Sequence, residues 1–360
     1  MTRSATRLLT ATALATAVAV PLASQPAAAQ DLDTASLAVV GTWSGLPLHR
    51  QFEDPFWTVT VPTESGGALE IALTTFDQMG VGGGDVFRLL SDGVFDIGAT
   101  VGDYTVADAP ELEGLDVPLV ATDADSARAM VDAARPMVAD IMADRFNAHM
   151  LAIAPYPPQI VFCNADISNG LADMEDLRVR ASGRMTAQFL EALGAEGITL
   201  AFSEVPAALE RGVIDCAITG SGSGYSAGWH ESATHVMPLP LGGWDPVITA
   251  VNLDTWNALP EATQIFLSDL IATEFEAPAW DLATSSLEND LNCLTGAGDC
   301  TSGDPADMIL VEASEEDLAL AQDALEGTVL PDWASRAGAD WATRWNDEVG
   351  SVVGVTVPVN

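Results

Sequence analysis

The chain has 360 residues, of which 52 are acidic and 13 basic, and its formal net charge is −39. It contains no lysine, so every strongly basic side chain is an arginine. A surface this acidic repels nucleic acids and anionic membranes, which excludes both classes of partner, and it is typical of adaptation to salt. The same field repels an anionic ligand at long range, so a binding site for one must be locally positive.

The first 29 residues are predicted to be a secretory signal peptide. Arg3 and Arg7 form a charged start, residues 8–22 are apolar, and the alanines at 27–29 fit a small-residue cleavage site. The alternative is a membrane anchor, but the apolar run is shorter than the about 20 residues needed to span a bilayer. We therefore expect a protein that is exported to the periplasm.

Residues 30–155 are predicted to form a first α/β domain. Strands are expected at 36–42, 68–74, 95–98 and 150–153, and helices at 48–59, 85–91 and 125–148. Short apolar runs indicate the strands, and apolar residues at i, i+3 and i+4 indicate the helices. The β-α-β-α-β order at the start predicts a parallel sheet with right-handed crossovers.

The proline cluster at 155–158 predicts a rigid, extended crossover into a second α/β domain, residues 156–246. That domain is expected to contain a strand at 159–162 and then a strand, turn, helix and strand between 177 and 202. Two α/β domains joined by crossing segments form a hinged interdomain cleft, which is the architecture of periplasmic binding proteins.

Residues 247–360 are predicted to form a return strand and a helical C-terminal part that packs on both domains. The return strand is expected at 247–251, and the helices at 261–291, 314–330 and 334–349. Residues 252–260 are predicted to cap the 261–291 helix, and Ser314 or its neighbour is predicted to open the 314–330 helix with a capping box.

The four cysteines of an exported chain indicate disulfides. Cys293 and Cys300 bracket a short loop that a bridge closes easily, so we expect them to pair. Cys163 and Cys216 each end a strand-like run, and they pair if the two strands are neighbours. A zinc site is the alternative, but the chain has no CxxC or HxxxH spacing that supports it.

Arg180 is the most informative single residue. It ends an apolar run just before a glycine turn, and a side chain at such a strand end faces the crevice where α/β domains bind ligands. Its guanidinium is a permanently charged fork that suits a carboxylate. The alternative is a structural ion pair with one of the many acidic residues. Arg178 alternates with Arg180 and is therefore expected on the other face.

Five segments resemble, in order, the solute-binding proteins of TRAP transporters, of the DctP type. They are FDIG at 95–98, EGLDVPL at 113–119, DLRVRASG at 176–183, AFSEVPAALERGVIDC at 201–216 and LDTWNAL at 253–259. The resemblance implies a two-domain, periplasmic-binding-protein-like α/β fold with long C-terminal helices. It also implies a receptor that captures an organic acid anion and delivers it to small and large membrane permease subunits, without catalysis.

The resemblance places the arginine that clamps the ligand carboxylate at Arg180 and the phenylalanine of the pocket wall at Phe202. Gln159 stands where the family often has a second arginine, and Thr219 stands where it has a cleft asparagine. Both side chains can donate hydrogen bonds to ligand oxygens. Because one arginine replaces the full set, we expect a monocarboxylate, such as a keto or aromatic acid, rather than a dicarboxylate.

Further ligand-binding candidates follow predicted strands or lie near the crossovers. They are Trp43, Gln78, Tyr104, Ser221 and Trp244, and the last could equally pack the hinge. The glycine runs at 82–84 and 220–224 are interpreted as turns, because the chain lacks the lysine of a phosphate loop. No cofactor and no metal are predicted, although aspartate-rich loops leave room for a Ca²⁺ ion in the cleft.

Two other functions remain open from the sequence. The first is a secreted hydrolase or lyase on the same scaffold, although the four histidines are scattered and no nucleophile elbow is present. The second is a ligand-binding partner of a sensor kinase, which would bind the same ligand but dock on a different membrane protein.

Overall fold

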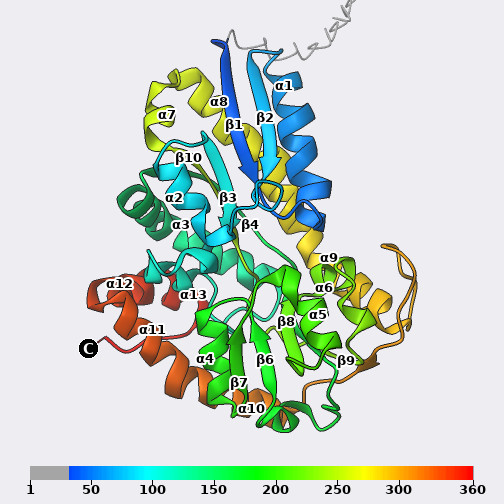
Figure 1. Ribbon diagram of the computed structural model, residues 1–360. Coiled ribbons are helices and arrows are strands. Elements are labelled where there is room, and N and C mark those ends of the chain that lie inside the picture. Colours follow the sequence, from blue (N-terminus) through cyan, green and yellow to red (C-terminus); the bar gives the residue numbers. More distant parts are fainter. Residues whose placement is uncertain (1–31, 360) are drawn as a thin grey trace, which may run out of the picture.

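The computed structural model describes residues 32–359. The predicted signal peptide lies outside the described residues. Within 32–359, no helix combines the length and the apolar character needed to cross a bilayer. Two sheets, one above the other in Figure 1, divide the fold into two lobes.

The first lobe is built on a five-stranded sheet in the order β2-β1-β3-β10-β4. The strands are β1 Ala35–Gly41, β2 Leu69–Thr75, β3 Ile97–Val101, β4 Ala148–Ala154 and β10 Val247–Asn252. β1 runs parallel to β2 and β3, so the predicted parallel arrangement is confirmed for these three strands. β10 comes from far along the chain and pairs antiparallel with β3 and β4, which makes the complete sheet mixed.

The second lobe is built on a six-stranded sheet in the order β11-β9-β5-β8-β6-β7. The strands are β5 Gln159–Cys163, β6 Arg178–Ala181, β7 Glu196–Thr199, β8 Cys216–Gly220, β9 His235–Met237 and β11 Ile309–Leu310. β6 runs parallel to β7 and β8, while β5 runs antiparallel to β8 and β9. The sequence did not predict β11, whose two residues pair with β9 across a long chain separation.

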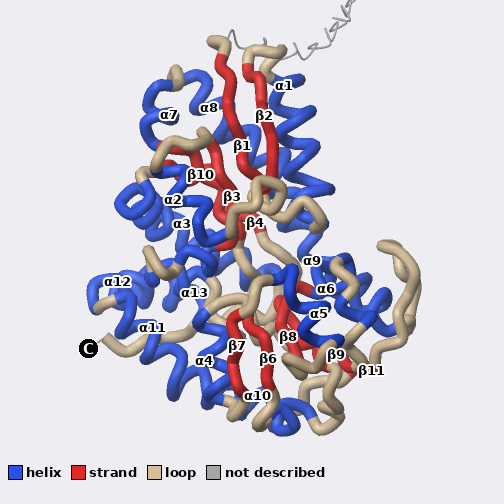
Figure 2. Tube along the Cα trace, in the orientation of Figure 1, coloured by secondary structure: helices blue, strands red, loops and turns tan. Residues whose placement is uncertain are grey.

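Helices cover the sheets and fill the space around them, as Figure 2 shows. They are α1 Val61–Glu64, α2 Val86–Ser91, α3 Ala124–Phe146, α4 Arg184–Ala192, α5 Val205–Glu210, α6 Ser221–Ser226, α7 Leu253–Ala258, α8 Glu261–Ile271, α9 Ala277–Thr295, α10 Glu315–Ala324, α11 Leu330–Ala337, α12 Ala339–Trp345 and α13 Ser351–Val353. Short 3-10 and π turns extend or join them, among them η1 His49–Glu53, η4 Gly102–Thr105, η5 Pro110–Leu115, η7 Phe202–Glu204 and η8 Trp229–Glu231.

Local sequence signals explain where several helices begin and end. Asn252 accepts hydrogen bonds from the first backbone N–H groups of α7, and Ser314 forms the predicted capping box with Asp317. The helix predicted over 334–349 is instead broken between α11 and α12. Gly338 causes the break, because its φ of 89° lies in the region that favours glycine and ends the helical backbone.

Two parts of the C-terminal region connect the lobes. In α9, the Trp280 indole donates to the Ile153 carbonyl of β4, while Asp290 accepts a hydrogen bond from Ser221 at the start of α6. In α11, Arg336 pairs with Glu113 of the first lobe and donates to Gln188 of α4. These helices therefore hold the lobes together beside the 155–158 crossover.

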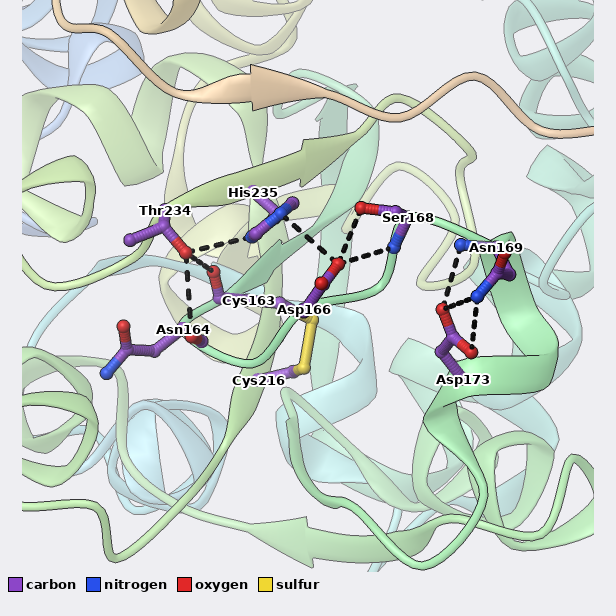
Figure 3. Close-up of polar contacts among 9 residues, drawn as sticks. All are labelled: Cys163, Asn164, Asp166, Ser168, Asn169, Asp173, Cys216, Thr234 and His235. Carbon is purple, nitrogen blue, oxygen red and sulfur yellow. Dashed lines mark hydrogen bonds and ion pairs between the residues drawn. A yellow bond between two sulfur atoms is a disulfide. The ribbon is translucent and has the colours of Figure 1, made fainter.

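Both predicted disulfides are present. Cys163 and Cys216 are direct partners in the β5–β8 ladder with a Cα–Cα distance of 4.0 Å, and Cys293 and Cys300 close the loop after α9. Figure 3 shows the first bond beside the loop that follows β5, where Asp166 accepts hydrogen bonds from Ser168. The bridge thus anchors the end of β5 to the strand beside Arg180.

Candidate functional site

A cavity of about 380 Å³ lies between the two lobes. Its wall combines the turn after β1, the glycine turn 82–84 and the η4 loop of the first lobe with the ends of β6 and β7 of the second. Its volume is within the range of small-molecule sites, and its place at the strand ends is where α/β sheets bind ligands. A separate hollow of about 570 Å³ lies between residues 45–51, Pro157, α6 and α9, and Arg180 does not line it.

Arg180 is held rigidly in the cavity wall by main-chain groups. It is 2% exposed, its Nε donates to the Leu200 carbonyl at 2.9 Å, and its Nη1 donates to the Ile218 carbonyl at 2.6 Å. Within residues 32–359 its guanidinium forms no ion pair, whereas Arg178 pairs with Asp215 at 2.7 Å. The guanidinium therefore carries a buried positive charge that no carboxylate in the described part of the chain neutralises by direct contact.

The charge of Arg180 survives its burial. Burial lowers the pKa of the guanidinium, while the nearby Tyr104 and Asp245 oppose that shift. Because an arginine starts from a pKa far above neutral, the side chain stays protonated at physiological pH. It can therefore act as the positive end of a carboxylate site.

Two carboxyl groups that the sequence did not single out lie near Arg180. Asp103 lines the cavity from η4, and Asp245 is 6% exposed in the loop before β10. Burial raises the pKa of Asp103 to about 8, with the charge of Asp245 adding to the shift and that of Arg180 opposing it. Burial also raises the pKa of Asp245 to about 7, again against Arg180. Both groups thus titrate near neutral pH.

Aromatic side chains from both lobes close the cavity. The Trp43 ring of the first lobe lies 5.7 Å from the Phe202 ring of the second, measured between centroids. Phe202 in turn lies 5.3 Å from Trp229, whose ring is 5.8 Å from the Arg180 guanidinium carbon. Flat apolar walls beside a buried cation suit a small organic acid with an apolar or ring-shaped remainder.

The predicted residues Gln159 and Thr219 lie next to this cavity. They line a much smaller gap of about 10 Å³ together with Trp43, Tyr104 and Phe202, which also line the larger cavity. The Gln159 amide nitrogen donates to the Pro157 carbonyl at 2.9 Å, and its buried oxygen has no partner among residues 32–359. The structure thus gathers six predicted residues around one place: Trp43, Tyr104, Gln159, Arg180, Phe202 and Thr219.

The structure does not bring the other three predicted residues to the cavity. The Trp244 indole is buried and donates to the Ala121 carbonyl, so it packs the core rather than a ligand wall. Ser221 is buried and donates to Asp290 at 2.6 Å. Gln78 is exposed on the turn after β2. Among residues 32–359, no group of three or more His, Cys, Asp or Glu side chains is arranged to hold a metal ion.

Ser182, Asp103 and Asp245 carried no usable sequence signal, whereas Arg184 opens the helix after the glycine turn and could be expected to reach the cleft. Ser182 lines the cavity with a buried hydroxyl that has no partner among the described residues, and the exposed Arg184 stands at its rim. Asp103 and Asp245 are two of 52 acidic residues, so their identity alone could not distinguish them. Only their positions, one after β3 and one before β10, could have indicated the cleft.

Comparison with known proteins gives one family and one fold. Residues 46–326 match the family model DctP, described as bacterial extracellular solute-binding protein, family 7. A Bordetella pertussis extracytoplasmic solute receptor binding pyroglutamic acid is 24% identical, with 88% of this chain and 100% of that chain covered and a TM-score of 0.75.

Two further solved structures share the fold. A TRAP periplasmic solute-binding protein from Desulfovibrio salexigens with bound orotic acid is 17% identical, with 88% and 99% covered and a TM-score of 0.75. A marine metagenome TRAP solute-binding protein in complex with 3-hydroxybenzoate is 20% identical, with 89% and 98% covered and a TM-score of 0.75. The predicted fold class, α/β and periplasmic-binding-protein-like, is confirmed by these likenesses.

Proposed function

This chain belongs to the DctP family of bacterial extracellular solute-binding proteins, family 7, and on that premise we propose that it is the periplasmic receptor of a TRAP transporter. It captures a small organic acid anion between its lobes and delivers it to the small and large permease subunits in the membrane. The observation that carries this proposal is Arg180, a buried cation without a protein ion pair in the wall of a 380 Å³ cavity.

The ligand carboxylate is proposed to supply the missing counter-charge. A guanidinium and a carboxylate form two parallel hydrogen bonds, and these are strengthened where the surroundings exclude water. Two main-chain carbonyls already orient Arg180, so little side-chain entropy is lost when the ligand arrives. Gln159 and Thr219 are proposed to donate hydrogen bonds to other ligand oxygens from the adjoining gap.

The shape of the wall favours a monocarboxylate. Trp43 and Phe202 present apolar rings, and the second arginine expected for a dicarboxylate is replaced by Gln159. Pyroglutamic acid, orotic acid and 3-hydroxybenzoate, which the similar receptors bind, are each a ring with one carboxyl group. We therefore propose a compact, single-carboxylate ligand for this chain.

Isothermal titration calorimetry with pyroglutamate, orotate and 3-hydroxybenzoate tests the proposal. Because hydrogen bonds to charged groups contribute about 1.5–3 kcal/mol, Arg180→Ala should weaken binding by about 10- to 150-fold. Arg178→Ala is the matched control, since Arg178 lies two positions before Arg180 on the same strand and pairs with Asp215 instead. Equal losses in both variants, or an unchanged affinity in Arg180→Ala, would refute the clamp.

The same protein samples also test whether the chain is a receptor or an enzyme. After prolonged incubation, mass spectrometry should recover the bound acid unchanged, whereas turnover would contradict the receptor. Delivery to a permease is tested by measuring uptake of the acid into cells that express the small and large permease subunits, with and without the receptor in the periplasm. Uptake that does not depend on the receptor would refute this part of the proposal.

A further inference from the structure

The cavity and the gap beside it carry carboxyl groups as well as guanidinium groups, and the proposed function uses only the guanidinium of Arg180. Asp103 reaches the cavity from the first lobe, opposite the β6 strand that holds Arg180. Asp245 lies beside the same junction, lining the small gap shared with Trp43 and Tyr104. Each carboxyl group is close enough to Arg180 for the charge of the arginine to oppose the rise of its pKa.

These two carboxyl groups are left without arginine partners, although acidic neighbours are paired. Glu111 and Glu113 of η5 are buried, and they form ion pairs with Arg145 and Arg336 respectively. Neither Asp103 nor Asp245 forms an ion pair with any arginine of residues 32–359. Asp103 and Asp245 therefore differ from these two glutamates, since neither forms an ion pair within the described residues.

Within residues 32–359, neither arginine at the cavity forms an ion pair with Asp103 or Asp245. Arg180 donates to two main-chain carbonyls, and Arg184 is exposed to solvent at the rim. Arg180, Arg184 and Asp103 line the cavity and Asp245 lines the gap beside it, and within residues 32–359 no ion pair joins these arginines to these aspartates. A ligand that is neutral overall and carries both charges would satisfy each group separately.

The aromatic walls are compatible with a cation as well as with an apolar ring. Trp43 and Phe202 lie 5.7 Å apart at the cavity, and Tyr104 adds a third ring to its lining. The face of an aromatic ring attracts a positively charged nitrogen, and the attraction grows when water is excluded. Ser182 adds a buried hydroxyl that can accept or donate a hydrogen bond.

We infer that the ligand is a zwitterion, whose carboxylate is held by Arg180 and whose cationic nitrogen is held by Asp103 and Asp245 between the aromatic walls. This inference rests on the proposed function, because it uses the same cavity and the same clamp. It keeps the single carboxylate of the proposed ligand and adds that the rest of the ligand carries one positive nitrogen.

Pairs of probes with the same shape test the inference, because they differ only in the nitrogen. L-proline is compared with cyclopentanecarboxylate, and glycine betaine with 3,3-dimethylbutyrate. In calorimetry, at least one zwitterion should bind about tenfold or more tightly than its carbon counterpart. Pyroglutamate, orotate and 3-hydroxybenzoate serve in parallel as probes of the proposed function alone.

Variants assign the preference to the carboxyl groups. Asp103→Asn and Asp245→Asn keep the shape but remove the charge, so each should weaken zwitterion binding about tenfold and leave or improve binding of the carbon counterpart. Asp92→Asn, on the exposed turn after α2, is the matched control and should change neither. Circular dichroism and melting temperature show whether each variant is folded.

The outcomes separate this inference from the proposed function. A carbon counterpart that binds as tightly as its zwitterion, or a preference unaffected by both aspartate variants, overturns the zwitterion inference and leaves the receptor intact. The absence of binding by either member of both pairs also overturns it. The proposed function is refuted separately if the three anion probes bind equally well to the unmodified protein and to Arg180→Ala.

Discussion

Gly183→Ala is expected to hold the two lobes apart. Gly183 precedes α4 with φ −142° and ψ −173°, an extended backbone that alanine adopts without strain. Across the lobe junction, however, the Asp103 carboxyl group occupies the place where a Cβ on residue 183 would lie. The substitution therefore affects the contact between the lobes rather than the local conformation.

The size of the effect follows from this geometry. The added Cβ would lie 2.5 Å from Asp103 Oδ1 and closer still to the other two carboxyl atoms, whereas ordinary van der Waals contact begins at 3.4 Å. The first lobe or the Asp103 side chain must retreat by at least the difference, 3.4 − 2.5 = 0.9 Å. Overpacking of this kind costs about 1–3 kcal/mol, so affinity for an anion probe should fall by about 5- to 150-fold.

Small-angle X-ray scattering and calorimetry with pyroglutamate measure the two consequences. The radius of gyration of Gly183→Ala should exceed that of the unmodified protein, and the affinity should be lower. Gly327→Ala is the matched control, because nothing lies within 4 Å of its added Cβ. Asp103→Ala in the Gly183→Ala background removes all three clashing atoms and should restore compactness. Unchanged scattering and affinity in the single variant would show that the junction absorbs the methyl group, and the reasoning would fail.

Two further predictions concern stability. The raised pKa values of Asp103 and Asp245, about 8 and about 7, mean that the folded protein binds more protons than the unfolded chain between pH 4 and 8. Their contribution is fully present below about pH 4 and is lost progressively up to pH 7–8, so the melting temperature of the ligand-free protein should fall between pH 4 and 8. The fall should be smaller in Asp103→Asn/Asp245→Asn, and equal falls would contradict the assignment. For the disulfides, replacing both cysteines of a pair by alanine should cost more at Cys163–Cys216, with a sequence separation of 53, than at Cys293–Cys300, with a separation of 7. Loop entropy gives about 4 and about 2.5 kcal/mol; denaturant unfolding measures both, and the reverse order would contradict the estimate.

Features that depend on neighbouring residues could be predicted from the sequence. The capping box at Ser314 and the strand that carries Arg180 follow from short patterns, because a backbone segment satisfies its hydrogen bonds locally. Both disulfide pairs were also within reach. One closes a short loop, and the other needed only the assumption that two strand ends are neighbours.

Features that depend on distant residues were decided by the tertiary structure. Trp244 and Ser221 were predicted at the ligand, yet the first donates to Ala121 and the second to Asp290, partners 123 and 69 residues away. Polar groups in a folded interior take whichever partner the packing offers, and the sequence around them does not record that partner.

The chemistry of the cavity divides in the same way. Arg180 stood out in the sequence because positive groups are scarce in a chain of net charge −39 and because it ends a strand. Asp103 and Asp245 did not, because acidic residues are everywhere. They reach Arg180 only because β10 inserts beside β3, which sets the loops at the ends of these strands next to each other at the lobe junction. The sequence by itself determined a buried cation at a strand end. The tertiary structure decided which carboxyl groups share its cavity, because burial and proximity, rather than residue type, set how strongly charges interact.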